Sequence, residues 1–493
     1  MTTKSIKKNF LFKFSLEILR IIIPIISIPY VYRIFNPQIM GNIEFSQSIS
    51  GYFFIFAGFG VYTYGLREVS RIRNDKEKRN KVFSELFFIS TLSTVVIFFV
   101  YVLYVFFNVK SDLILKNMLL INSIQIIAYI FYLEWINEAF ENYKFIAQKT
   151  IIIKILNVIC IFLFIKVVSD FYKYLLMINI FILLNNLISF FYIKRYMTFT
   201  FKELEIKKYL FPLLVILLIN NINILYTQLD KIFLGYFTVS REEIAYYGIG
   251  QKIMTIIMVL IMSLINVSKP RLSFYLGENQ EKEYFKLLEK LFTYMFILLF
   301  PMGIGIVILS REMCLFFGGE NYLAANLVVI VFGIRMIEVS VESLLSNQIL
   351  FLYRKEKVIA LIYGICGIFN FLMKFILIKE WLGIKFNAET AILTTMFAEI
   401  LIIILSILYI KKYLKLEIII FKWIYLKYFI FSLSFFGIKY LFKNIEINYF
   451  LHSILVFIVC SITYIFLLFL SKDKYLFEIL YKIKIVREIG EGK

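Results

Sequence analysis

The sequence predicts an all-α, polytopic membrane protein of about 14 transmembrane helices, and three observations carry this prediction. Hydrophobic residues make up 61% of the 493 residues, against about 45 to 50% in soluble domains. They gather in runs of the roughly 20 residues that a helix needs to cross a bilayer. The loops between these runs are short, so none of them is predicted to hold a soluble domain.

Apolar runs and the breakers between them predict where each helix lies. The first run follows a basic leader, but it carries Glu17 and Arg20 and lacks a small-residue cleavage site, which predicts a retained span rather than a signal peptide. The predicted spans are 10–35, 43–66, 83–107, 113–137, 150–168, 172–193, 208–236, 243–268, 287–309, 321–350, 357–379, 387–410, 423–442 and 449–471.

The basic residues predict the orientation of these spans. The formal net charge is +20, and Lys and Arg gather in the loops after the even-numbered spans, such as the loop from Arg67 to Lys81. By the positive-inside rule both termini are then cytoplasmic, as an even number of spans requires. This distribution explains the charge without a nucleic-acid partner. The four cysteines show neither a disulfide framework nor the spacing of a zinc site.

An internal repeat divides the chain. Four residues of the first half match four of the second at a constant offset of 204 (251 − 47): Gln47, Ile49, Lys78 and Glu85 match Gln251, Ile253, Lys282 and Glu289. Because spans 1 and 7 both start in the cytoplasm, the copies are parallel. The predicted domains are an N-terminal lobe at 1–200, a C-terminal lobe at 201–415, and an extra helix pair with a cytoplasmic tail at 416–493.

Polar residues form a stripe on the first span of each predicted lobe. Span 1 carries Glu17, Arg20, Pro24 and Ser27, and span 7 carries Asn220, Asn223, Thr227 and Asp230, both with the 3, 4, 3 spacing of one helical face. Charged groups inside a membrane span normally face a bundle interior or a water-filled cavity. The stripes therefore predict a central cavity, and interhelical hydrogen bonding is the alternative explanation.

Other spans add polar groups. Arg335, Glu338 and Glu342 share one face of span 10, where the first two can neutralise each other. Span 4 carries Gln125, span 8 Lys252, span 11 Lys374 and span 12 Glu399. Lys154 is interpreted as a snorkelling or rim charge, and for Lys231 snorkelling explains the position equally well.

No enzymatic constellation is visible, because the sequence has no Walker loop, no HExxH and no sugar-nucleotide motif in a cytoplasmic loop. The chain is therefore not expected to be an enzyme, and no cofactor or metal site is expected. Energy for transport would come from an ion gradient, the membrane potential or the gradient of the substrate.

Three stretches resemble a known family. IPYVYRIFNPQIMGNIEFSQSISGYFFIFAGFGVYTYGLREVSRIR (28–73), FYLEWINEAFENYKFIAQKT (131–150) and LDKIFLGYFTVSREEIAYYGIGQKI (229–253) are similar to bacterial Wzx-type polysaccharide flippases. These flippases belong to the multidrug/oligosaccharidyl-lipid/polysaccharide exporter superfamily. The extra helix pair resembles the 14-span lipid II flippases of the same superfamily.

The resemblance implies two six-helix lobes around a central cavity that alternates between cytoplasmic and outer access. It implies a polyprenyl-pyrophosphate-linked glycan as substrate, bacterial inner-membrane localisation among membrane lipids, and a polysaccharide polymerase and glycosyltransferases as partners. In this reading Arg20, Arg335 and Lys252 pair the pyrophosphate, and Asn220, Asn223 and Gln125 bind sugar hydroxyls. Glu17, Asp230, Glu338, Glu342 and Glu399 release the phosphate or carry coupling ions.

Three alternatives stay open. A drug exporter of the same superfamily would have a mostly acidic cavity, against which Arg20 and Arg335 argue. An integral-membrane glycan polymerase would need a sizeable external loop, and a scaffold would need no buried charges on aligned faces. The turn at 238–243 is predicted to lie outside the cytoplasm and to pair with the turn at 36–44 as an outer gate.

Overall fold

The computed structural model describes residues 6–200, 204–227, 229–238, 240–381, 383–416, 422–445, 448–478 and 481. The side chains of 6–15, 17, 20 and 218–227 lie outside this description, although their backbone is helical. Within these ranges the structure is helical and contains no strand, which confirms the predicted all-α class.

The first part of the chain forms α1 (Ile6–Ile34), α2 (Pro37–Ala57), α3 (Val61–Arg71), α4 (Lys76–Asn108), α5 (Leu113–Ala128), α6 (Glu134–Ala139), α7 (Tyr143–Phe164), α8 (Phe171–Ile193), α9 (Lys207–Thr227) and α10 (Leu229–Phe237). The second part forms α11 (Glu242–Gly277), α12 (Glu281–Ile308), α13 (Ser310–Gly318), α14 (Asn326–Leu344), α15 (Glu356–Ile378), α16 (Ala388–Tyr409), α17 (Trp423–Leu441) and α18 (Tyr449–Leu470).

Among the described residues, 12 helical segments are long and apolar enough to cross a membrane. They correspond to every predicted span except the first and the seventh, and those two coincide with α1 and with α9 and α10. The protein is therefore a multi-pass membrane protein, while the count of 14 stays a prediction.

The chain divides into two compact units. Unit 1 comprises residues 1–248 and 371–391, and unit 2 comprises 249–370 and 392–493. Unit 1 therefore takes one segment, 371–391, from the second half of the sequence. The lobes at 1–200 and 201–415 and the extra pair at 416–493 stay a prediction.

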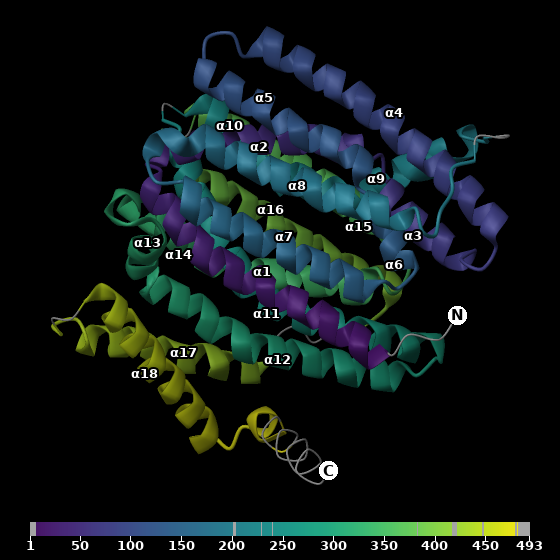
Figure 1. Cartoon of the computed structure of the whole chain (residues 1–493). Helices are drawn as coiled ribbons and strands as arrows, with labels where there is room; N and C mark the ends of the chain where they lie inside the picture. The colour runs from purple at the N-terminus through teal and green to yellow at the C-terminus, as the bar shows by residue number, and fades with distance from the viewer. Residues whose placement is uncertain are drawn as a thin grey trace. The chain divides into compact units, whose positions relative to one another are not determined.

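In unit 1, α5 packs against α2, α4 and α8, and α7 packs against α1 and α8 (Figure 1). The outer faces stay apolar because they meet lipid instead of water: on α4, Phe99 and Leu103 are exposed whereas Tyr101 and Val105 are buried. The short helices α3 and α6 pack together beside α4, around a core that includes Phe83 and Trp135.

The segment between α8 and α9 is fastened to the start of α4. Asn80 Nδ2 donates to Thr198 Oγ1 at 2.6 Å, and the backbone N–H of Thr200 donates to Ser84 Oγ at 2.8 Å. Asn80 and Ser84 lie one turn apart, so a single face of α4 holds the segment.

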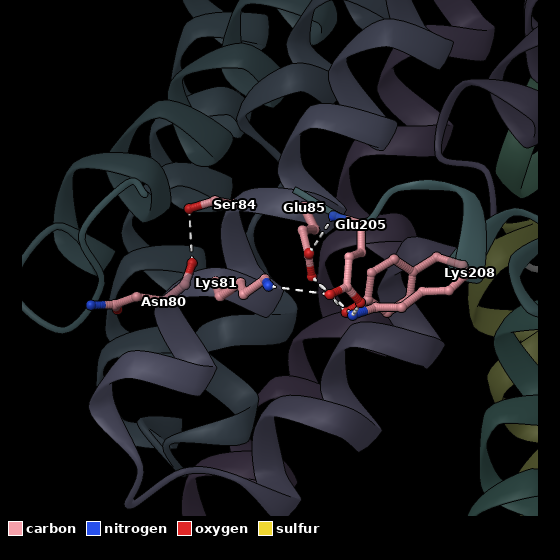
Figure 2. Close-up of polar contacts among 7 residues, drawn as sticks. Asn80, Lys81, Ser84, Glu85, Glu205 and Lys208 are labelled. Carbon is pink, nitrogen blue, oxygen red and sulfur yellow. Dashed lines mark hydrogen bonds and ion pairs between the residues drawn. The ribbon is translucent and has the colours of Figure 1, made fainter. Parts of the chain in front are cut away.

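Glu85, the next residue of α4, is fully buried and completes this attachment. Its carboxylate accepts the backbone N–H of Glu205 at 2.8 Å and the hydroxyl of Tyr209 at 2.6 Å. Figure 2 shows this cluster, with Lys81 and Lys208 reaching the carboxylate of Glu205 at 3.5 and 2.7 Å. The start of α9 is therefore held on α4 through one buried carboxylate.

In unit 2, α12 packs against α14 and α17, and α17 packs against α18 (Figure 1). The helix pair outside the sequence repeat is α17 and α18. Within this pair, α17 packs directly on α12. The ion pair between Glu289 of α12 and Lys422 holds the start of α17. Glu289 is the residue that the sequence repeat matches to Glu85.

Candidate functional site

Unit 1 buries two ion pairs that involve neighbouring residues of α10. Lys231 Nζ lies 2.6 Å from Glu44 Oε2, and Lys374 Nζ lies 2.8 Å from Asp230 Oδ1. The side chains of Lys374 and Asp230 are both 0% exposed. Charges so deep in a membrane protein are expensive unless each has a partner and further hydrogen bonds.

Two tyrosines supply these further hydrogen bonds. Tyr32 donates its hydroxyl to Glu44 Oε1 at 3.0 Å, and Tyr247 donates its hydroxyl to Asp230 Oδ2. The two carboxylates therefore each have an ammonium and a phenol as partners. The pairs tie α10 to α2 and to α15.

The sequence anticipated only part of this arrangement. Asp230 was predicted as a counter-charge, and the structure gives it the partner Lys374 from a helix far along the chain. Lys231 could equally have been a snorkelling residue, but the structure buries it against Glu44, which the sequence had not singled out. No spacing rule could join residues 187 positions apart, so this pairing needed the tertiary fold.

The predicted turn at 36–44 is instead almost wholly the start of α2, and this helix start lies against the turn before α11, at 238–241, in unit 1. A Cβ added to Gly41 would stand 1.8 Å from the backbone oxygen of Arg241, so only glycine permits this approach. Ser240 donates to Gln38 Oε1 at 3.3 Å, and the Arg241 guanidinium lies 4.2 Å from the centre of the Phe45 ring. The two turns, each with the helix start that follows it, are thus closed on each other.

Outside the spans, burial lowers the pKa of Arg241, while Asp112 and Tyr236 oppose this effect by favouring the charged form. The guanidinium at the turn is therefore partly removed from water. Its contact with the ring of Phe45 compensates for some of the lost hydration.

Unit 2 buries an arginine among carboxylates. Arg335 Nε lies 2.9 Å from Glu399 Oε2, and Arg335 Nη2 lies 2.6 Å from Glu399 Oε1, which is the fork geometry of a strong bidentate pair. The sequence offered Glu338, one turn along the same helix, as the neutralising partner. The structure instead brings the bidentate partner from α16.

Glu338 and Glu342 lie on the same helix as Arg335. Glu342 is buried and accepts a hydrogen bond from Ser346 at 3.3 Å, whereas Glu338 Oε2 is buried without a hydrogen-bond partner in the described structure. Arg335 and Glu399 form the described ion pair of this group. Ionised carboxylates close together would repel each other strongly at this depth.

Six further residues were predicted for the site. The side chains of Glu17, Arg20, Asn220 and Asn223 lie outside the described residues. Gln125 on α5 and Lys252 on α11 are half-buried. In the described part of the chain, no group of three or more His, Cys, Asp or Glu side chains is placed to hold a metal ion.

Solved transporter structures share this fold. A lipid II flippase MurJ in an inward closed conformation is similar with a TM-score of 0.69 and 17% identity, covering 92% of this chain and 98% of that chain. An inward-facing multidrug resistance MATE family transporter of the MOP superfamily is similar with a TM-score of 0.64 and 11% identity, covering 83% and 99%. At these identities the likeness concerns the fold alone.

Sequence comparison reaches a curated protein and two families. A protein of Shigella dysenteriae described as "Putative O-antigen transporter" is 22% identical over 412 residues, which are 82% of this chain and 100% of that protein. The MatE family matches residues 216–376. The family described as polysaccharide biosynthesis protein matches residues 6–276, more than half of the chain and the whole of the closed turn region, and the chain therefore belongs to this family.

Proposed function

We propose that the protein is a flippase that moves polyprenyl-pyrophosphate-linked oligosaccharide units across the cytoplasmic membrane by alternating access, for surface polysaccharide synthesis. The observation that carries this proposal is the family match over residues 6–276, and the likeness of 82% of the chain to the "Putative O-antigen transporter" of Shigella dysenteriae supports it. The function is transport rather than catalysis. The MurJ-like fold is compatible with it.

The pyrophosphate is the physical obstacle to this transport, because an anion in hydrocarbon costs far more than thermal energy. We assign its neutralisation to Arg20, Lys252 and Arg335, since Arg binds phosphate oxygens in a bidentate way. Asn220, Asn223 and Gln125 are assigned to the sugar hydroxyls. Glu17, on the same stripe as Arg20, is assigned to releasing the phosphate.

The Arg335–Glu399 pair supports a coupling role for the acidic centre of unit 2. Arg335 can bind phosphate only when Glu399 gives it up, and protonation of Glu399 would do this. Glu338 and Glu342 keep negative charge close by and are assigned to the uptake of the coupling ion. Phosphate would then displace the carboxylate in one half-cycle, and Glu399 would reclaim the arginine in the other.

In unit 1 the closed turns and the buried Glu44–Lys231 pair are assigned to the outer gate. Opening to the outside would separate Gly41 from Arg241 and expose the ion pair below them to water. Closing the gate would remove water from the pair again. The attraction between Glu44 and Lys231 and the hydrogen bond from Tyr32 would offset this cost. Asp230 and Lys374 stay paired behind this gate.

A leaflet-access assay tests the function. The full chain is reconstituted into proteoliposomes that contain a polyprenyl-pyrophosphate disaccharide, and translocation is followed by enzymatic access to the sugar. We expect movement by the wild type, loss of most of it in Arg20→Ala, and partial retention in Arg20→Lys. Arg67→Ala, on an exposed arginine paired with Glu68, is the control.

Two negative outcomes have separate meanings. If the folded wild type moves no lipid-linked sugar, the flippase proposal fails. If the wild type is active and Arg20→Ala moves the lipid as fast at equal protein level, the flippase stands and the role of Arg20 falls.

Crosslinking tests the gate. Gln38→Cys and Ser240→Cys, in a background without the four native cysteines, should be joined by a short bifunctional thiol reagent in the closed-turn state, because the ends of the native side chains are within hydrogen-bond distance. Transport substrate should lower the crosslinked fraction. A fraction that is the same with and without substrate would contradict a moving gate.

A drug exporter is the second candidate, favoured by the match of the MatE family to residues 216–376. Resistance profiling of an expressing strain separates the two functions, since an exporter lowers sensitivity to cationic drugs and a glycan flippase does not. For either function we assign the protein to the bacterial inner membrane with both termini in the cytoplasm. A polymerase and glycosyltransferases are proposed partners for the flippase.

A further inference from the structure

A pocket with several basic residues lies inside unit 2, between the end of α11 and the start of α12. It has a volume of about 500 Å³, which is the size of a site for a small ligand or for one part of a larger ligand. Arg271 and Tyr275 of α11 line it, together with Lys286 and Lys290 of α12. These residues are separate from the candidate site described above.

One face of each helix forms the pocket, because the lining residues follow one another at the intervals of three and four that a helical face requires. They include Leu264, Ser268 and Arg271 on α11, and Lys286, Lys290 and Tyr294 on α12. Arg271 lies about 9 Å before the end of α11 and Lys286 about 8 Å after the start of α12, at the helical rise per residue. Both cations are therefore at a similar distance from the short turn that joins the two helices.

The pocket changes from apolar to basic along its length. Helix α11 has 36 residues, or about 54 Å, which exceeds the roughly 30 Å of hydrocarbon in a bilayer. The predicted span ends at residue 268, which puts Leu264 and Val267 in the hydrocarbon and Arg271 at the level of the lipid headgroups. By the predicted topology these are headgroups of the cytoplasmic leaflet. Val267 is 67% exposed, so the pocket opens at the surface of the molecule.

Arg271 and Lys286 are the accessible cations of this pocket. Arg271 is exposed, and its Nε donates to the Tyr275 hydroxyl at 3.0 Å, which orients the guanidinium without neutralising it. None of the described ion pairs includes Arg271. The side chain of Lys286 is 67% exposed, and its ammonium lies 3.8 Å from Glu283 Oε1, beyond the length of a hydrogen bond. Both cations can therefore donate hydrogen bonds to an incoming anion.

Lys290, one turn further along α12, already holds an anionic oxygen. Its ammonium lies 2.9 Å from Glu478 Oε1, and Glu478 belongs to the segment that follows α18. This wall of the pocket therefore stabilises a carboxylate of the chain itself. Arg271 and Lys286 are left for a further anion, whose oxygens they can bind with charge-assisted hydrogen bonds.

We propose that this pocket binds the headgroup of an anionic phospholipid from the cytoplasmic leaflet. Arg271 and Lys286 donate to the phosphate oxygens, and the apolar part beside Leu264 and Val267 receives the start of an acyl chain. A zwitterionic headgroup carries its own ammonium beside the phosphate, which the two cations repel. A free phosphate ion gains nothing from the apolar part. The inference does not depend on the flippase function.

Binding of two matched probes tests the site. One probe is a fluorescent short-chain phosphatidylglycerol, and the other is a phosphatidylcholine with the same chains and fluorophore. Fluorescence anisotropy follows their binding to the purified full chain in an uncharged detergent. We expect Arg271→Ala/Lys286→Ala to weaken phosphatidylglycerol about tenfold and to leave phosphatidylcholine nearly unchanged, because two charged contacts to the anionic headgroup are lost.

A second double variant controls for the general attraction between basic residues and anionic lipids. Arg354→Ala/Lys357→Ala removes the same two charges from exposed residues of unit 2 outside the pocket. We expect this variant to lose much less affinity for phosphatidylglycerol than the pocket variant. Equal losses in the two variants would show attraction to the surface as a whole and would overturn the site.

Glu478→Gln should have the opposite effect. It removes the carboxylate that neutralises Lys290, so phosphatidylglycerol should bind more tightly than to the wild type. Weaker binding by Glu478→Gln would contradict the proposal, and so would equal affinities of the wild type for the two probes. If the alanines prevent folding, Arg271→Gln/Lys286→Gln removes the same charges with less loss of side-chain volume and is compared in the same way.

Competition separates the possible sources of the phosphate. Inorganic phosphate should displace phosphatidylglycerol only weakly, because it has no acyl chain for the apolar part of the pocket. Displacement by inorganic phosphate as readily as by unlabelled phosphatidylglycerol would overturn a lipid site. A short-chain prenyl pyrophosphate should compete no better than phosphatidylglycerol. A clear preference for the prenyl pyrophosphate would overturn the phospholipid assignment and assign the pocket to the transport substrate.

Discussion

The two units bury their charges differently. In unit 1 three carboxylates of the spans each form an ion pair with one ammonium: Glu44 with Lys231, Asp230 with Lys374, and Glu134 with Lys149. In unit 2 the guanidinium of Arg335 forms a bidentate pair with Glu399, and Glu338 and Glu342 lie on the same helix as Arg335.

The ion pairs of unit 1 are expected to keep their charges, whereas the carboxylates of unit 2 are expected to change theirs. A one-to-one pair gains nothing from binding another proton or cation, so unit 1 is expected to keep its charges through the transport cycle. Neighbouring carboxylates favour uptake of a proton or a cation, because their charges repel each other. We propose that coupling to an ion gradient acts at Glu338 and Glu342 of unit 2.

The largest effect is expected from breaking a balanced pair. Lys374→Met leaves the carboxylate of Asp230 fully buried without its cation, which costs about 3 to 5 kcal/mol. Thermal unfolding in detergent measures this loss. The exposed Lys385→Met is the control, and adding Asp230→Asn to Lys374→Met should restore most of the stability, since no charge is then left unpaired.

A smaller effect is expected at the repeat-matched carboxylates that hold α9 and α17. Glu85 is fully buried and accepts two short hydrogen bonds, so Glu85→Gln should cost about 1 to 3 kcal/mol. The side chain of Glu289 is 46% exposed and pairs with Lys422, so Glu289→Gln should cost about 0 to 1 kcal/mol. Chemical unfolding of both variants in parallel gives the ranking, and equal losses would remove burial as the cause.

Substitutions at Glu338 and Glu342, near the Arg335–Glu399 pair, should affect transport more than stability. Glu338→Gln removes a charge whose Oε2 atom has no described partner, so its stability should change by less than about 1 kcal/mol. Transport by this variant should depend less on the imposed pH gradient than transport by the wild type. If transport by Glu338→Gln and by Glu342→Gln depends on the pH gradient as strongly as transport by the wild type, coupling lies in another part of the chain.

The smallest effect concerns the exposed Glu205 beside Glu85. The hydrogen bond from Lys208, followed by the charges of Lys208 and Lys81, lowers the pKa of Glu205 below its usual value of 4.5. Because the folded pKa is the lower one, the contribution to stability is present above pH 4.5 and is lost as the pH falls through the folded value.

Melting temperatures test the direction of this pH dependence of stability. Glu205→Gln should melt slightly below the wild type at pH 7, and the difference should vanish at acidic pH and in high salt. A difference that grows on acidification would contradict a carboxylate stabilised in its charged form.

The class of the fold could be predicted from the sequence because bilayer thickness imposes a length and a composition on every span. The spans at 83–107 and 449–471 are recovered as α4 and α18 for this reason. The site was harder to predict. Asp230 and Arg335 were identified because a charge in a span is costly, but their partners lie on other helices and no local spacing could indicate them.

The sequence by itself determined that this is a multi-pass helical membrane protein, which residues carry charge inside the spans, and which family the chain resembles. Only the tertiary structure decided how the charges are shared: Glu44 with Lys231, and Arg335 with Glu399. The physical reason is that hydropathy acts along the chain, whereas charge pairing depends on which helices come within a few ångströms of each other.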